Sequence, residues 1–109
     1  HYFTMRDIDE QGIPVIMSKA LEYAGNKTAG IHLSFDIDSI DPLHAPGVST
    51  PVFGGLSLRE SHLILEMIAE SEKMISMDLV ELNPLVDIGG KSANLAIELI
   101  QSALGKSIV

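Results

Sequence analysis

Two short apolar runs of β-type composition alternate with three stretches of helical periodicity along this chain. Residues 14–25 place apolar side chains at helical spacing, between a proline near the start and a glycine at the end. Residues 29–36 (AGIHLSFD) are short, apolar and partly β-branched, which is typical of a buried strand. Alternation of this kind predicts right-handed crossovers and a parallel sheet in an α/β fold.

The second half of the chain repeats the pattern after a long loop over residues 39–56. Ser57 and Glu60 form an S-x-x-E capping box, which predicts a helix that continues to about residue 72. Residues 74–82 (MISMDLVEL) indicate a second strand, and residues 92–104 a third helix. Ligands bind beyond the carboxyl ends of parallel strands, so these ends are where we expect a site.

The apolar content of the chain is high for its length. Of 109 residues, 46% are hydrophobic, which favours elements that are covered on both faces. The chain begins with His1, and residues 2–5 look like the middle of a strand. We therefore expect residues 1–109 to be the carboxy-terminal part of a single domain in a larger protein.

The charge and the absence of cysteine narrow the class of protein. The net charge is −8 and lysine and arginine form no cluster, so a phosphate backbone would be repelled and we expect no nucleic-acid partner. Without cysteine there is neither a disulfide nor a zinc–thiolate site. No apolar stretch reaches the roughly 18 residues of a membrane span. We expect a cytoplasmic protein that does not bind membranes.

Three aspartates, Asp36, Asp38 and Asp41, follow the first strand directly. In an extended chain, residues two apart share a face, so Asp36 and Asp38 would reach one small volume. Two ionised carboxylates there need a proton, an arginine or a metal, and the first cation that follows them in the sequence is Arg59, beyond the long loop. Oxygen ligands favour a hard divalent metal, although the same two residues could simply cap the loop. For Asp41 we predict an Asx-turn before Pro42.

The surrounding sequence resembles the signature of the arginase/agmatinase (ureohydrolase) family. Residues Ser34 to Glu60, "SFDIDSIDPLHAPGVSTPVFGGLSLRE", are similar to the pattern S-x-D-x-D-x-x-D-P-x-x-A-P-G-x-x-T-P. Residues 78–84 (DLVELNP) resemble a second motif, and "YFTMRDID" with the following helix resembles the segment before both. The resemblance extends over all 109 residues in the same order and corresponds to the last third of such an enzyme. Ser49 stands where the family usually has glycine.

The resemblance implies an arginase-like, three-layer α/β/α fold with a parallel sheet and two Mn²⁺ ions at its carboxyl edge. It implies that Asp36 bridges the two ions, that Asp38 binds one of them, and that both are catalytic. Two metals lower the pKa of a shared water, so that hydroxide attacks the guanidinium carbon of the substrate. By the same match, Glu81 pairs with the guanidinium group and Thr50 lines the substrate pocket.

Within the family, residues 50–60 (TPVFGGLSLRE) look more like arginases than agmatinases, which implies hydrolysis of L-arginine to L-ornithine and urea. Agmatinase and formimidoylglutamase are the alternatives. A non-catalytic scaffold or assembly fragment is another, because most of the family's metal ligands lie outside these residues. For that reason we expect the isolated chain to be inactive. The family also implies a homo-oligomer, either a trimer or a hexamer.

None of the histidines is predicted to bind metal, because the family's G-x-H and D-x-H-x-D motifs do not occur here. We expect His32 to be a hydrogen-bonded core histidine, His44 to face solvent and His62 to be structural on its helix. Ser34 is a candidate to hydrogen-bond a metal ligand.

Overall fold

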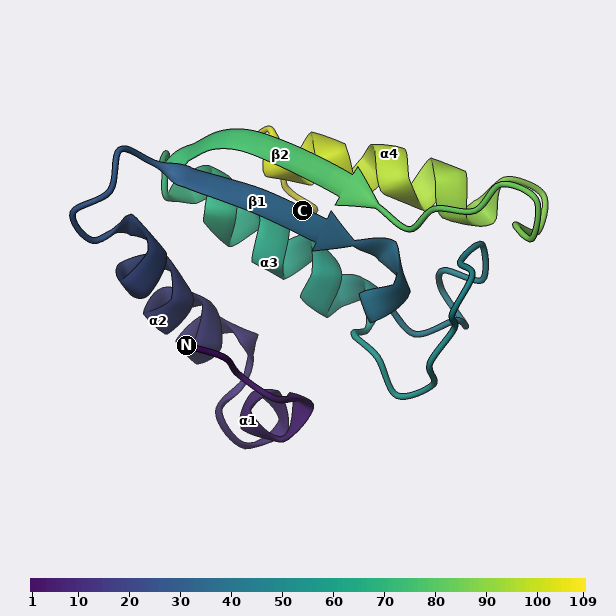
Figure 1. Ribbon diagram of the computed structural model, residues 1–109, viewed down its shortest axis with the longest axis horizontal. Helices are drawn as coiled ribbons and strands as arrows, with labels where there is room; N and C mark the ends of the chain where they lie inside the picture. Colours follow the sequence, from purple (N-terminus) through teal and green to yellow (C-terminus); the bar gives the residue numbers. More distant parts are fainter.

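The computed structural model describes all residues from His1 to Val109 and contains four α-helices, one 3-10 helix and two strands (Figure 1). In chain order these are α1 (Met5–Gln11), α2 (Ile13–Gly25), β1 (Ile31–Asp36), η1 (Ile37–Ser39), α3 (Leu58–Glu70), β2 (Met74–Val80) and α4 (Lys91–Ala103). The three helices and two strands expected from the sequence are confirmed. Ser57 is the N-cap of α3 and forms the expected capping box with Glu60.

Helix α1 contradicts the expectation of a strand over residues 2–5. Thr4 is the N-cap of this helix: its hydroxyl accepts a hydrogen bond from the Asp7 backbone N–H at 3.2 Å, and the Asp7 carboxylate accepts one from the Thr4 backbone N–H at 2.7 Å. This is a capping box in which aspartate takes the place of glutamate. The capping pair therefore starts a helix where the apolar run Tyr2–Phe3 suggested a strand.

The two strands pair in parallel, as expected, and α3 is the crossover between them. The register places Phe35 opposite Leu79 and Asp36 opposite Val80. Both strands therefore end at the same edge of the sheet, from which the loops after β1 and β2 extend together (Figure 1). This parallel arrangement sets the segment after Asp36 beside the segment that begins with Glu81.

The hydrophobic core lies on one face of the sheet, between the strands and the row of helices α2, α3 and α4. Phe35 and Ile37 are buried there against Leu65 of α3 and Leu99 of α4. Alternate residues of both strands point to the other face, which is exposed in this chain. These residues thus supply the sheet and one helical layer of the expected three-layer arrangement.

His32 lies on the exposed face, so the expectation of a core position is wrong for this chain. Its side chain is 52% exposed, and the alternation of β1 turns it away from Phe35 and the helices. The expectation of a hydrogen bond is confirmed, because His32 Nδ1 lies 2.8 Å from Ser76 Oγ. The interaction joins β1 to β2 across the open face.

His62 is structural, as expected. It is buried between α3 and α4, and its Nδ1 lies 2.9 Å from Ser102 Oγ. Burial lowers the pKa of His62, although the nearby Glu98 and Glu66 oppose this shift. The buried pair therefore fixes one helix against the other.

The longest helices have 13 residues, and none of the helices could span a membrane.

Candidate functional site

The first two aspartates meet at the carboxyl end of β1, but not by the route that strand geometry suggested. The strand ends at Asp36, and Asp38 already lies in η1, so the extended spacing expected for the pair is wrong. Instead, the Asp36 carboxylate accepts a hydrogen bond from the Asp38 backbone N–H at 3.0 Å and caps the short helix. The tight turn, rather than strand alternation, brings the two carboxylates together.

Thr50 reaches the same place from the long loop. Its Oγ1 donates a hydrogen bond of 2.9 Å to Asp38 Oδ2 across 12 residues of sequence. In each of the two aspartates, one carboxylate oxygen therefore accepts a hydrogen bond from another part of the chain. This hydrogen bond therefore brings the Pro/Gly-rich loop beside the aspartates.

Negative charge is concentrated at this edge. Burial raises the pKa of Asp36, and the neighbouring carboxyl groups of Asp38 and Glu81 raise it further. The hydrogen bond from the Asp38 backbone N–H acts in the opposite direction and lowers this pKa. The first cation that follows the aspartates in the sequence is bound elsewhere. Arg59 forms a two-pronged ion pair with Glu66, with Nη1–Oε1 2.9 Å and Nη2–Oε2 2.7 Å. The aspartates are thus left without an arginine partner.

The donor set fits a hard divalent cation in kind but not in number. Carboxylate oxygens are ligands that Mn²⁺ accepts, and Asp36 and Asp38 supply them at one point. Nowhere in the chain, however, do three His, Cys, Asp or Glu side chains gather closely enough to hold a metal ion. By themselves these residues therefore do not complete a metal site, and any further ligands would have to come from outside the chain.

Glu81 follows β2 directly and has an unusual backbone. Its φ is +66°, in the left-handed region that residues other than glycine rarely adopt, and its side chain is exposed. The reversed backbone turns the chain away from the sheet, and Leu82 then forms an antiparallel bridge with Val48 of the long loop. No local pattern of residues predicts this conformation, which puts the exposed Glu81 carboxylate close enough for its charge to act on Asp36.

The long loop is closed at its base, where Ile40 and Leu56 form a bridge. Asp41 makes the expected Asx-turn, with Oδ1 accepting from the Leu43 backbone N–H at 2.9 Å and Oδ2 accepting from the Gly54 backbone N–H at 2.8 Å. These backbone hydrogen bonds lower the pKa of Asp41. Its role is therefore to shape the loop, as expected.

Gly55 is required by a close backbone approach at the same base. A Cβ atom added there would lie 2.6 Å from the Ser39 carbonyl oxygen, a distance that real Cβ atoms do not show. The loop can return to the sheet edge only because this side chain is missing.

Asp87 anchors the other end of the site and was missed by sequence reasoning. Its carboxylate accepts hydrogen bonds from the backbone N–H groups of Ser92 (2.9 Å) and Ala93 (3.0 Å) at the start of α4. Burial opposes ionisation, but these bonds lower the pKa of Asp87 overall. The Ser92 hydroxyl in turn accepts from the Gly47 backbone N–H at 2.7 Å, which ties the loop to the helix. An aspartate shortly before a predicted helix was the available signal.

The remaining candidates lie outside this cluster. Ser34 is exposed on the open face of the sheet, two residues before Asp36. His44, expected to face solvent, is half-buried and lines a surface cavity with Lys91 and Asn94.

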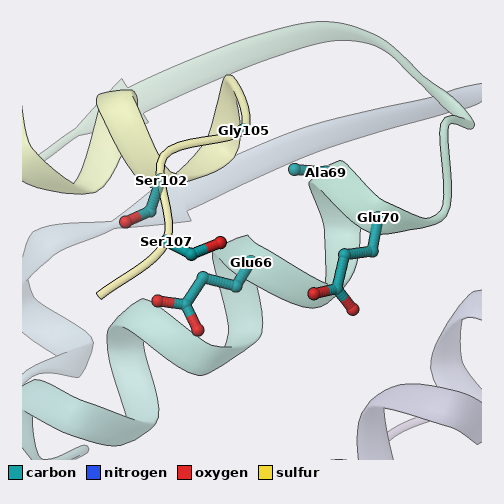
Figure 2. Close-up of a pocket in the computed structure, with 6 residues that line it drawn as sticks. All are labelled: Glu66, Ala69, Glu70, Ser102, Gly105 and Ser107. Atoms are coloured by element: carbon teal, nitrogen blue, oxygen red, sulfur yellow. The ribbon is translucent and has the colours of Figure 1, made fainter. Parts of the chain in front are cut away.

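A separate cavity of about 140 Å³ lies at the far end of α3, away from the aspartates. Glu66 and Glu70 project from the same side of α3, and the end of α4 and the chain's last residues complete the lining through Ser102 and Ser107 (Figure 2). Glu66 is already paired with Arg59. This cavity offers neither a free cation nor a strong nucleophile, so it does not compete as an active site.

Comparison with known proteins extends over nearly the whole chain. The sequence profile of the Arginase family matches residues 1–105. The chain is 44% identical over 108 residues to an arginase from Staphylococcus aureus (strain COL), covering 98% of this chain and 36% of that protein. The crystal structure of the Bacillus caldovelox arginase matches 98% of this chain and 36% of its own with a TM-score of 0.93 and 43% identity, which confirms the arginase-like fold.

A second solved structure, formimidoylglutamase from Bacillus subtilis subsp. subtilis str. 168, is more distant. It has a TM-score of 0.88 and 29% identity, over 94% of this chain and 32% of its own. The chain spans about a third of the length of the relatives it matches.

Proposed function

Because this chain belongs to the arginase family, we propose that the protein it forms part of hydrolyses a guanidino substrate, and that this substrate is L-arginine. The products would be L-ornithine and urea. The higher identity to arginases than to formimidoylglutamase supports arginine as the substrate. The observation that carries the proposal is the meeting of Asp36, Asp38 and Thr50 at the carboxyl edge of the sheet, while Arg59 is engaged by Glu66.

In this proposal Asp36 and Asp38 would hold a manganese pair together with ligands from outside these residues, and Asp36 would contribute to both ions. Manganese, when bound, would supply Lewis-acid activation of water near neutral pH. Thr50 holds the Asp38 carboxylate in one orientation through Oδ2, and Oδ1 would then be the oxygen available to a metal. The hydrogen bond from the Asp38 backbone N–H orients the Asp36 carboxylate in the same way.

Glu81 would orient the substrate. A carboxylate has two acceptor oxygens, which match the planar, forked donors of a guanidinium group. The exposed Glu81 side chain at the end of β2 is free to accept such a pair of bonds beside the aspartates. Its role is to hold the guanidinium carbon in place, and it does not take a proton.

The proposal includes a homo-oligomer, a trimer or hexamer. Large apolar side chains are exposed in this chain, Leu85 at 94% and Phe53 at 77% among them. Such side chains normally lie against another surface, either the remainder of the protein or a second copy.

Manganese content and urea release test the site in the intact protein. We expect Asp36→Asn to lose bound Mn²⁺ and urea release from arginine together, because one carboxylate oxygen is replaced by a weak amide ligand. Asp9→Asn, at an exposed aspartate of α1, is the matched control and should retain both. Full manganese content in Asp36→Asn would refute the bridging role. Failure of the wild-type protein to release urea with manganese present would instead favour a non-catalytic scaffold.

A further inference from the structure

Asn83 fastens the segment after β2 to the long loop. Its backbone N–H donates to the Gly47 carbonyl at 2.8 Å, and its side-chain Nδ2 donates to Ser49 Oγ at 3.0 Å. Between these two bonds, Val48 and Leu82 form their antiparallel bridge. The contact therefore joins residues 34 apart in the sequence.

The residues next to this contact are those assigned to the substrate. Ser49 directly precedes Thr50, whose hydroxyl binds Asp38. Asn83 follows Glu81 by two positions. The side-chain hydrogen bond thus sets the separation between the loop that carries Thr50 and the turn that carries Glu81.

The backbone of Glu81 makes this separation important. A φ of +66° is unfavourable for glutamate and persists only where the flanking chain is held on both sides. On one side, Val80 pairs with Asp36 in the sheet. On the other side, Leu82 and Asn83 are held by the loop. If the loop-side restraint weakens, Glu81 can relax and its carboxylate moves.

Ser49 stands where the resemblance to the family implies a glycine. Glycine has no side chain to accept the bond from Asn83 and leaves the backbone freer. The Ser49 hydroxyl therefore adds a restraint that the glycine would not provide, at the residue before Thr50.

We propose that Asn83 and Ser49 form a clamp that positions Thr50 relative to Glu81 and thereby sets the affinity for the guanidino substrate. The inference rests on the proposed function, because it assigns the positioning residues of that same site. Neither member of the clamp needs to touch the reacting atoms. Its effect reaches the substrate through Thr50 and Glu81.

Steady-state kinetics of the intact, manganese-loaded protein with arginine test the clamp. Ser49→Ala removes the acceptor, and we expect KM to rise about 3- to 10-fold with kcat nearly unchanged, as for the loss of one net hydrogen bond. Ser49→Thr keeps a hydroxyl and should restore KM to within about twofold. Ser18→Ala, which removes an exposed hydroxyl bonded only within α2, is the matched control and should leave KM unchanged.

Measuring KM and kcat separately distinguishes a loss of positioning from simple destabilisation of the fold. A destabilised variant has a smaller fraction of active protein, which lowers the apparent kcat and leaves KM unchanged. A loss of positioning raises KM instead. Asn83→Ala should raise KM at least as much as Ser49→Ala, and the double variant should be no worse than Asn83→Ala alone. An unchanged KM in Ser49→Ala, or effects that multiply in the double variant, would overturn the clamp. An inactive wild-type protein would overturn the proposed function itself, whereas an active wild type with unchanged KM in the variants overturns the clamp alone.

Discussion

The ion pair between Arg59 and Glu66 predicts a pH-dependent loss of stability in Glu66→Gln. The two side chains make hydrogen bonds of 2.9 and 2.7 Å, and Glu66 also accepts one from the Ile108 backbone N–H at 3.1 Å. Hydrogen bonds from Arg59 lower the pKa of Glu66 from 4.5 to about 2, with a further contribution from Ile108. The glutamate side chain is 8% exposed. Replacing it with glutamine keeps the shape and removes the charge.

The magnitude follows from linkage. A fall in pKa from 4.5 to about 2 corresponds to at most about 3.5 kcal/mol, at about 1.4 kcal/mol for each pKa unit. The Arg59 side chain is 54% exposed, so solvent screens the pair and we expect Glu66→Gln to lower the free energy of unfolding by about 1 to 2 kcal/mol at neutral pH. Because the folded pKa is the lower one, this stabilisation is complete above about pH 4.5 and is lost as the pH falls toward about 2.

Urea denaturation followed by circular dichroism, repeated from neutral pH to about pH 3, measures this difference. Glu70→Gln is the matched control, since Glu70 lies one turn further along α3, lines the same cavity and is exposed (Figure 2). It should change the free energy of unfolding by less than about 0.5 kcal/mol. Equal effects of the two variants at neutral pH, or a Glu66→Gln effect that does not shrink in acid, would refute the electrostatic explanation.

Three further predictions concern the site and its loop. Glu81→Gln should retain bound manganese in the intact protein but raise KM for arginine about tenfold or more, because a charge-assisted pair of hydrogen bonds is lost; an unchanged KM would contradict its role. Gly55→Ala should lower the free energy of unfolding by about 1 to 3 kcal/mol, because the added Cβ would meet the rigid Ser39 carbonyl. In Gly25→Ala the added Cβ meets only the flexible Lys73 side chain, so this control should lower the free energy of unfolding far less in the same denaturation assay. The isolated 109-residue chain should release little or no urea with manganese present, and turnover at an ordinary enzymatic rate would show that the two aspartates suffice.

The sequence was a good guide to the fold wherever one local signal acted alone. The Ser57–Glu60 capping box and the periodicity of residues 58–70 placed α3 correctly, because both are properties of adjacent residues. At the N-terminus two local signals competed, and the capping pair of Thr4 and Asp7 prevailed over the apolar residues beside it.

The site was less predictable because its geometry depends on contacts between distant residues. Asp36 and Asp38 were found from their spacing, but the turn that joins them replaces the strand geometry assumed for them. The positive φ of Glu81 and the bond from Asn83 to Ser49 depend on how the loop after β1 meets the turn after β2. No pattern of neighbouring residues encodes such a meeting.

The bridge between Ile40 and Leu56 holds the two ends of the long loop together at the sheet edge, and the buried Ala45 and Val48 fix the first half of the loop in the core. The tip over residues 51–53 is exposed and lies between these fixed points. Lengthening or exchanging this tip therefore adds only a slowly growing closure entropy and leaves the strand and α3 in place. The tip can thus vary in length and sequence while the aspartates on the other side of the bridge keep their positions.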